Sequence, residues 1–173
     1  MAFIKRFQQF RSKTFFDLQD NYLKKLPSLR PAGCDVIHFV RDRYDVGDLV
    51  SLKGEEREKR TKGKTSKEYD PQDTLLIPDW GLFMMNPKNK SNLLHYLAKA
   101  WERQHGNLPQ GVHLMVGDCL RDSGCTLDLI SAGVAIIPEL SCALHEEADT
   151  RMFAHISYSA KCTSSQESCN ICN

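Results

Sequence analysis

The hydrophobic positions along the chain predict helices and strands in alternation. Apolar residues recur at roughly helical spacing over residues 3–26, and a second helical pattern over residues 90–104 follows Asn89, which is expected to cap it. Buried strands are predicted from three short apolar runs, at residues 34–40, 112–116 and 133–137. A last helix is predicted over residues 145–160. This alternation indicates an α/β fold with a mainly parallel sheet flanked by helices.

Two segments between these elements have no clear hydrophobic period. Residues 54–69 are highly charged and are expected to form a short helix that runs into a loop, and residues 74–85 are expected to form a connector. No internal repeat and no linker divides the chain, so residues 1–161 are predicted to form one domain. Residues 162–173 are mostly Ser, Cys and Asn and are predicted to be a flexible Cys/Ser-rich tail.

The composition is that of an ordinary globular protein. The 173 residues are 41% hydrophobic and 26% charged, and their formal net charge of +1 indicates no particular partner. No apolar run is long enough to span a membrane, so no membrane partner is expected. The seven cysteines, an odd number without a secretory signal, favour a reducing compartment. We therefore expect an intracellular protein, nuclear or cytoplasmic.

Three carboxylates stand together at the start of the last predicted helix. Glu146, Glu147 and Asp149 lie within four residues, and neighbouring carboxylates repel one another unless a cation relieves the repulsion. Hard oxygen ligands of this kind hold Mg²⁺ or Mn²⁺. The alternative is structural, because acidic residues at a helix N-terminus favour the helix dipole and Glu147 can pair with Arg151. From these residues alone, the structural interpretation is favoured.

A second constellation begins where the first predicted strand ends. Asp42 stands just past that end, the position at which α/β sheets place ligands and catalytic groups. Residues 57–67 carry six cations against one anion, a run that is able to grip a phosphate backbone, although a solvated loop is the alternative. The candidate phosphate contacts are Lys53, Arg57, Lys59, Arg60, Lys62 and Lys64. His38, inside the strand, is interpreted as structural, and Asp118, after the second strand, as a turn residue or a spare metal ligand.

Four motifs occur in an order that resembles a known group of proteins. The motifs are residues 42–60, Ile77-Pro-Asp-Trp80, Asn89-Lys-Ser-Asn-Leu-Leu94 and Glu146-Glu-Ala-Asp-Thr-Arg151. Together they resemble an uncharacterised, transposon-like, multi-copy family of animal proteins, which is in turn similar to the PIN-like and flap-endonuclease nucleases. The resemblance covers about residues 36–160 and implies a PIN-like α/β fold.

The resemblance also implies roles for particular residues. Asp42, Glu147 and Asp149 would hold Mg²⁺ or Mn²⁺, while Lys53 and Arg60 would act on the scissile phosphate. The remaining cations of the 53–64 region would hold the nucleic acid. A protein with these groups would be a metal-dependent phosphodiesterase, in which the metal ions activate water and stabilise the phosphate oxyanion.

The chain departs from the nuclease pattern at both ends. Active nucleases of this class begin with a strand that carries another Asp, where residues 3–26 here predict a helix. They also carry a pair of Asp residues after the acidic helix, where this sequence has Glu167 alone, and Arg41 replaces the apolar residue usual before the strand-end Asp. We therefore expect a PIN-like domain truncated at both ends and a degenerate or incomplete nuclease, which a partner chain would complete by extending the sheet. The alternative is a non-catalytic nucleic-acid-binding or interaction module derived from a mobile element.

Overall fold

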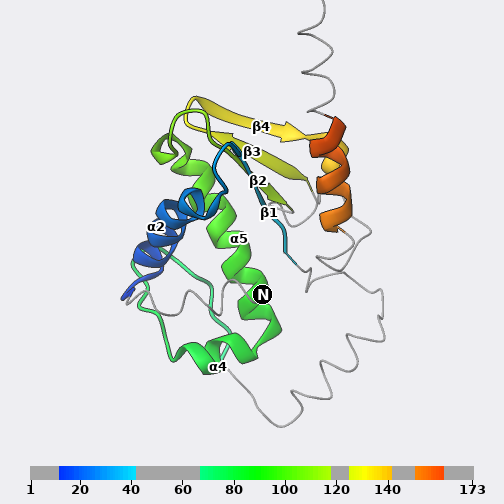
Figure 1. Cartoon of the computed structure of the whole chain (residues 1–173). Coiled ribbons are helices and arrows are strands. Elements are labelled where there is room, and N and C mark those ends of the chain that lie inside the picture. Colours follow the sequence, from blue (N-terminus) through cyan, green and yellow to red (C-terminus); the bar gives the residue numbers. More distant parts are fainter. Residues whose placement is uncertain (1–11, 42–66, 118–124, 142–150, 162–173) are drawn as a thin grey trace, which may run out of the picture.

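A four-stranded mixed sheet is the centre of the structure, which is a computed structural model that describes residues 12–41, 67–117, 125–141 and 151–161 (Figure 1). The strands lie in chain order: β1 (Val36–Phe39), β2 (His113–Gly117), β3 (Thr126–Ile130) and β4 (Gly133–Ile137). β1 pairs with β2 in parallel, whereas β2 with β3 and β3 with β4 are antiparallel. The α/β prediction is confirmed at this level, and the expectation of a mainly parallel sheet is wrong.

The sheet is mixed because two of its connections are short. β3, which pairs with both β2 and β4, was not predicted from the hydrophobic pattern. Residues 131–132 join β3 to β4, a two-residue loop that can connect only antiparallel strands. Residues 118–125 between β2 and β3 are also fewer than the dozen or so that a parallel crossover needs. The predicted strands at 34–40, 112–116 and 133–137 correspond to β1, β2 and β4.

The first described helix, α2 (Phe15–Lys25), begins at a capping box. The Thr14 hydroxyl accepts a hydrogen bond from the Asp17 N–H at 3.1 Å, and the Asp17 carboxylate accepts one from the Thr14 N–H at 3.0 Å. The helix ends in a 3₁₀ turn, η2 (Leu26–Leu29), where Pro27 removes a main-chain donor. The structure thus confirms the later part of the helix predicted over 3–26, and the part within 1–11 lies outside the described residues.

The cap of the long helix α5 (Pro87–Arg103) lies three residues before the predicted cap. Asn86 caps it by accepting from the Lys88 N–H at 2.9 Å, and Pro87 at the first helical position has no N–H to satisfy. Asn89 therefore lies inside the first turn, and its prediction as the cap is wrong. The connector predicted over 74–85 contains a further short helix, α4 (Trp80–Met85), which Asp79 caps.

The hydrophobic core lies between one face of the sheet and the helices α2 and α5, and α4 adds to it by packing against α5 (Figure 1). Trp101 on α5 is fully buried, and its ring meets Phe39 of β1 edge-on with the ring centroids 5.0 Å apart. Its indole N–H donates to the Gln19 carbonyl at 3.1 Å, which ties α5 to α2. Trp80 is partly buried and stacks on Phe83 at the edge of the core.

A last helical segment, residues 151–161, lies on the opposite face of the sheet, drawn in orange and red in Figure 1. Its position follows from strand alternation, because Phe39 points to the core while the neighbouring His38 points away and contacts this segment. The segment confirms the later part of the helix predicted over 145–160. None of the described helices is both long enough and apolar enough to cross a membrane.

Candidate functional site

The residues predicted to bind metal and phosphate all lie outside the described part of the chain. They are Asp42, Lys53, Arg57, Lys59, Arg60, Lys62, Lys64, Glu147 and Asp149. The segments that flank them are described, and Arg41 and Arg151 stand beside Asp42 and Asp149 in the sequence. These flanking segments, and the groups that hold them together, form the described part of the candidate site.

Arg41 and Arg151 join two segments that are far apart in the sequence. The Arg151 guanidinium donates through Nη1 to the Arg41 carbonyl oxygen at 3.1 Å, across 110 positions of chain. Both side chains are buried, with 5% of Arg41 and 2% of Arg151 exposed. The bond fixes the end of the β1 segment against the start of the described 151–161 helix. Buried cations of this kind require anionic or strongly polar surroundings.

Gly117, the last residue of β2, lies beside the 151–161 helix at the same edge. A Cβ atom at Gly117 would lie 3.4 Å from His155 Nε2 and 3.6 Å from the Phe39 carbonyl oxygen. Because β1 and β2 are parallel, their carboxyl ends meet at one edge of the sheet. That edge is where α/β sheets bind ligands. In the sequence Asp42 follows Arg41, and Asp118 follows Gly117.

Two histidines and a serine clamp the helix onto the sheet. His38 Nδ1 and His155 Nδ1 are 2.8 Å apart, and His38 Nε2 is 2.8 Å from Ser159 Oγ. The Ser159 hydroxyl also donates to the His155 carbonyl at 3.1 Å. All three contacts are satisfied together when His155 Nδ1–H donates to His38 and His38 Nε2–H donates to Ser159. In that arrangement His38 is not a base for Ser159, so the cluster is a structural clamp rather than a nucleophile with its activating base.

The contact between the two histidines requires a neutral His38, whose Nδ1 must accept, and burial disfavours the charged form of both imidazoles. Burial lowers the pKa of His155 to about 4, and the neighbouring His38 and Arg151 add to this effect. Burial also lowers the pKa of His38, although the Asp128 carboxylate opposes part of that shift. Protonating either ring would place a charge in a poorly solvated site next to a buried guanidinium. The contact is therefore expected to weaken in acid.

Asp128 adds a carboxylate to the same face of the sheet. Its Oδ2 lies 2.8 Å from His113 Nδ1, and its Oδ1 is buried with no hydrogen-bond partner in the described part of the chain. Sequence analysis missed Asp128 because it missed β3, although the alternation of Thr126-Leu-Asp-Leu-Ile130 is the signal of a strand with one polar face. Within the described ranges, no group of three or more His, Cys, Asp or Glu side chains is arranged to hold a metal ion.

Comparisons with protein-family models, with curated proteins and with solved structures found no match to this chain. The similarity to PIN-like and flap-endonuclease nucleases therefore stays a prediction from the sequence motifs.

The two cysteines within the described residues, exposed Cys34 and buried Cys125, are both free thiols.

Proposed function

We propose that the chain is a metal- and nucleic-acid-binding domain of the PIN/flap-endonuclease type whose nuclease site is incomplete. The observation that carries the proposal is the hydrogen bond from Arg151 to the Arg41 carbonyl. It joins the segment that leads into Asp42 to the helix that follows Glu147 and Asp149 in the sequence. The meeting point is the carboxyl edge of the parallel pair β1–β2, where ligands of α/β sheets bind.

The chemistry of the donors fits a hard divalent cation. Asp42, Glu147 and Asp149 offer carboxylate oxygens, the ligands that Mg²⁺ and Mn²⁺ prefer. The bound ion would supply Lewis-acid polarisation of a phosphate and a more acidic water. The chain's own part is to steady the phosphate through Lys53 and Arg60 and to hold the strand through the other cations of the 53–64 region.

Three carboxylates are fewer than the set expected in an active nuclease, so we propose weak metal binding and little or no cleavage. A partner chain that extends the sheet would be needed to restore a full site. The specific alternative is a non-catalytic module, derived from a mobile element, that binds nucleic acid through the cationic region alone. The effect of metal on nucleic-acid binding distinguishes the two functions. Only in the nuclease-like site would the bound metal ion also contact the phosphate of the nucleic acid.

A Mn²⁺ titration followed by electron paramagnetic resonance tests the metal site. We expect the double variant Glu147→Gln/Asp149→Asn to bind Mn²⁺ at least about tenfold more weakly, since each lost charged ligand contributes more than 1 kcal/mol. The control is Asp70→Asn, an exposed carboxylate elsewhere on the fold, which should leave the affinity unchanged. The contrary outcome is a double variant that loses stability to urea and keeps its Mn²⁺ affinity. In that case Glu147 and Asp149 neutralise the buried Arg41 and Arg151, and the proposal that they bind a metal ion is wrong.

The salt dependence of DNA binding tests the cationic region. A fluorescent 5′-flap DNA is titrated with the whole chain at several salt concentrations, with and without Mn²⁺. We expect Lys59→Gln/Lys62→Gln/Lys64→Gln to reduce the slope of log K against log salt by about 2–3, because each phosphate contact releases a condensed cation. The control removes three lysines of the described part, Lys24→Gln/Lys25→Gln/Lys99→Gln, and should change the slope much less. Unaltered DNA binding by the Lys59→Gln/Lys62→Gln/Lys64→Gln variant would contradict this role. Mn²⁺-dependent cleavage of the flap DNA by the unaltered chain, above the level of Glu147→Gln/Asp149→Asn, would show that the nuclease site is complete.

A further inference from the structure

The outer edge of β1 has main-chain groups that are open to another strand. Val36 pairs with His113 in the parallel register, and the His113 N–H donates to the Asp35 carbonyl at 2.8 Å. In a parallel ladder the main-chain groups of successive residues point to alternate sides. Those of Asp35 and Ile37 therefore face β2, and those of Val36, His38 and Val40 face outward. Across the described ranges, these three outward-facing residues have no main-chain hydrogen-bond partner, and β1 has a strand neighbour only at β2.

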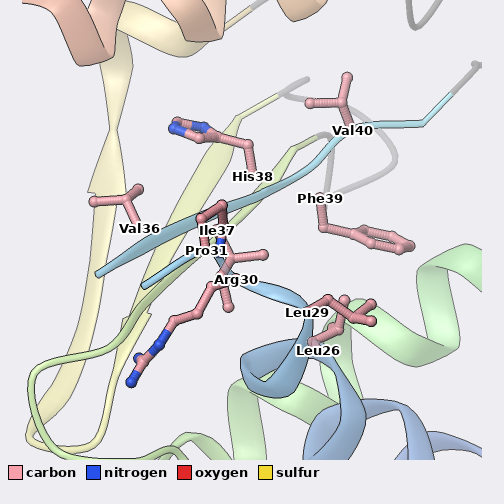
Figure 2. A pocket seen from close by; sticks show the side chains of 9 residues that line it. All are labelled: Leu26, Leu29, Arg30, Pro31, Val36, Ile37, His38, Phe39 and Val40. Carbon is pink, nitrogen blue, oxygen red and sulfur yellow. The ribbon is translucent and has the colours of Figure 1, made fainter. Parts of the chain in front are cut away.

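A groove runs along this edge between β1 and the turn that follows α2. Its volume is about 340 Å³, and it is lined by Leu26, Leu29, Arg30 and Pro31 on one side and by residues 36–40 on the other (Figure 2). Leu29 is 48% exposed and Val36 is 40% exposed, so apolar surface faces the groove without cover. Gly33, with φ of +79°, makes the turn that brings the chain from η2 back into β1.

Arg30 gives the groove a charge requirement. Its Nη1 is buried and has no hydrogen-bond partner among the described residues, which is costly for a cationic group. Figure 2 shows the Arg30 side chain extending away from Leu26 and Leu29, so the apolar and the cationic parts of the groove are separated. A carboxylate brought in by a ligand would satisfy Nη1 in a charge-assisted pair.

We propose that this edge binds an extended, acidic segment of a partner protein, which adds to the sheet as a strand beside β1. The main-chain groups of Val36, His38 and Val40 would pair with it, an apolar side chain would cover Leu29, and an Asp or Glu would bind Arg30. The charge of Arg30 favours an acidic partner over a second copy of this chain, because a second copy paired edge to edge through its own β1 would bring another Arg30 to the same surface. This inference is independent of the metal and nucleic-acid site.

Two synthetic peptides test the charge requirement on the whole chain. Both are eight-residue alternations of Thr and Val, one with a single central Glu and one with Lys in its place. We expect the Glu peptide to bind at least about tenfold more tightly, and Arg30→Gln to weaken its binding by about fivefold while leaving the Lys peptide unaffected. Lys25→Gln, a nearby exposed cation outside the groove, is the control. Equal binding of the two peptides, or no binding of either at millimolar concentration, would overturn the proposal.

N-methylation of the Glu peptide tests the strand pairing without altering the protein. Methyl groups on alternate nitrogens remove the donors on one edge of an extended peptide, so we expect one of the two alternate patterns to abolish binding and the other to preserve it. Amide NMR signals of Val36, His38 and Val40 should shift on binding. If both methylated peptides bind like the parent, strand addition is wrong. A dimer of the chain that Val36→Pro dissociates would assign the edge to a second copy, and this also would overturn the proposal.

Discussion

Between pH 7.5 and pH 5 the free energy of unfolding is expected to fall by about 2 kcal/mol through His155 alone. An unfolded histidine takes up a proton near pH 6.5, whereas burial holds the pKa of His155 at about 4 in the folded chain. Below pH 6.5 the unfolded state therefore binds more protons than the folded state. The stability that is present at neutral pH is lost as the pH falls from about 6.5 to about 4. His38, whose pKa burial also lowers, acts in the same direction.

Urea unfolding at the two pH values measures this loss, and His155→Gln identifies its source. The glutamine keeps a polar contact for His38 but does not titrate, so the difference between pH 7.5 and pH 5 should shrink by about 2 kcal/mol. His105→Gln is the matched control, because the His105 ring contacts the Ile130 carbonyl and takes no part in the clamp. An NMR titration in which His155 protonates near pH 6.5 would contradict the prediction.

Protonation of His155 and His38 is also expected to affect the proposed metal site. His155 and Ser159 hold the 151–161 helix on the sheet through His38, and Arg151 of that helix holds the end of the β1 segment. Protonation of the clamp is therefore expected to loosen the helix and to separate the two segments that flank the predicted metal ligands. Mn²⁺ affinity should then fall more steeply below pH 6 than protonation of the carboxylates alone requires.

The sequence was a good guide to elements bounded by strong local signals. β-Branched residues and a following proline define β4 at the predicted residues 133–137, and the apolar face of residues 90–104 defines most of α5. β3 was missed because its alternation is short and Asp128 interrupts the apolar run. That one omission led to the expectation of a mainly parallel sheet, since β3 supplies both antiparallel pairs.

The clamp could not be predicted, because its members are brought together by tertiary structure. His38 and His155 are separated by 117 positions, and nothing in either neighbourhood identifies the other as its partner. The interpretation of His38 as structural agrees with the clamp, but it was made from its place in a strand alone. Arg41 departs from the nuclease pattern, which has an apolar residue at this position. In the structure its main-chain carbonyl accepts a hydrogen bond from the Arg151 guanidinium. The predicted metal and phosphate ligands lie outside the described residues and stay predictions.

Asn89→Ala is expected to lower the free energy of unfolding by about 3 kcal/mol, since it removes hydrogen bonds to three main-chain groups. Of these, the Phe83 carbonyl keeps a second donor, the Asn86 N–H at 3.4 Å. The Asn89 side chain is fully buried, and its Oδ1 accepts from the Tyr69 N–H at 2.7 Å. Its Nδ2 donates to the Lys67 carbonyl at 3.0 Å and to the Phe83 carbonyl at 3.1 Å. Two of these three groups are only part-buried, so water replaces some of the lost bonding and keeps the loss below the sum of three full penalties.

Urea unfolding measures the loss, and Asn92→Ala provides the graded comparison. Asn92 donates to the Tyr69 carbonyl at 2.8 Å from a part-buried position, so its loss should cost about 1 kcal/mol. Asn89→Asp keeps the acceptor for Tyr69 but sets a carboxylate against two carbonyl oxygens, and it should be as harmful as Ala. If Asn89→Ala costs less than about 1 kcal/mol, the three bonds are not formed together in solution. In the sequence, Lys67 and Tyr69 come soon after the candidate phosphate contacts at residues 53–64, and Asn89 holds this next described segment in place. Asn89→Ala should therefore also weaken the binding of flap DNA, and more than Asn92→Ala does.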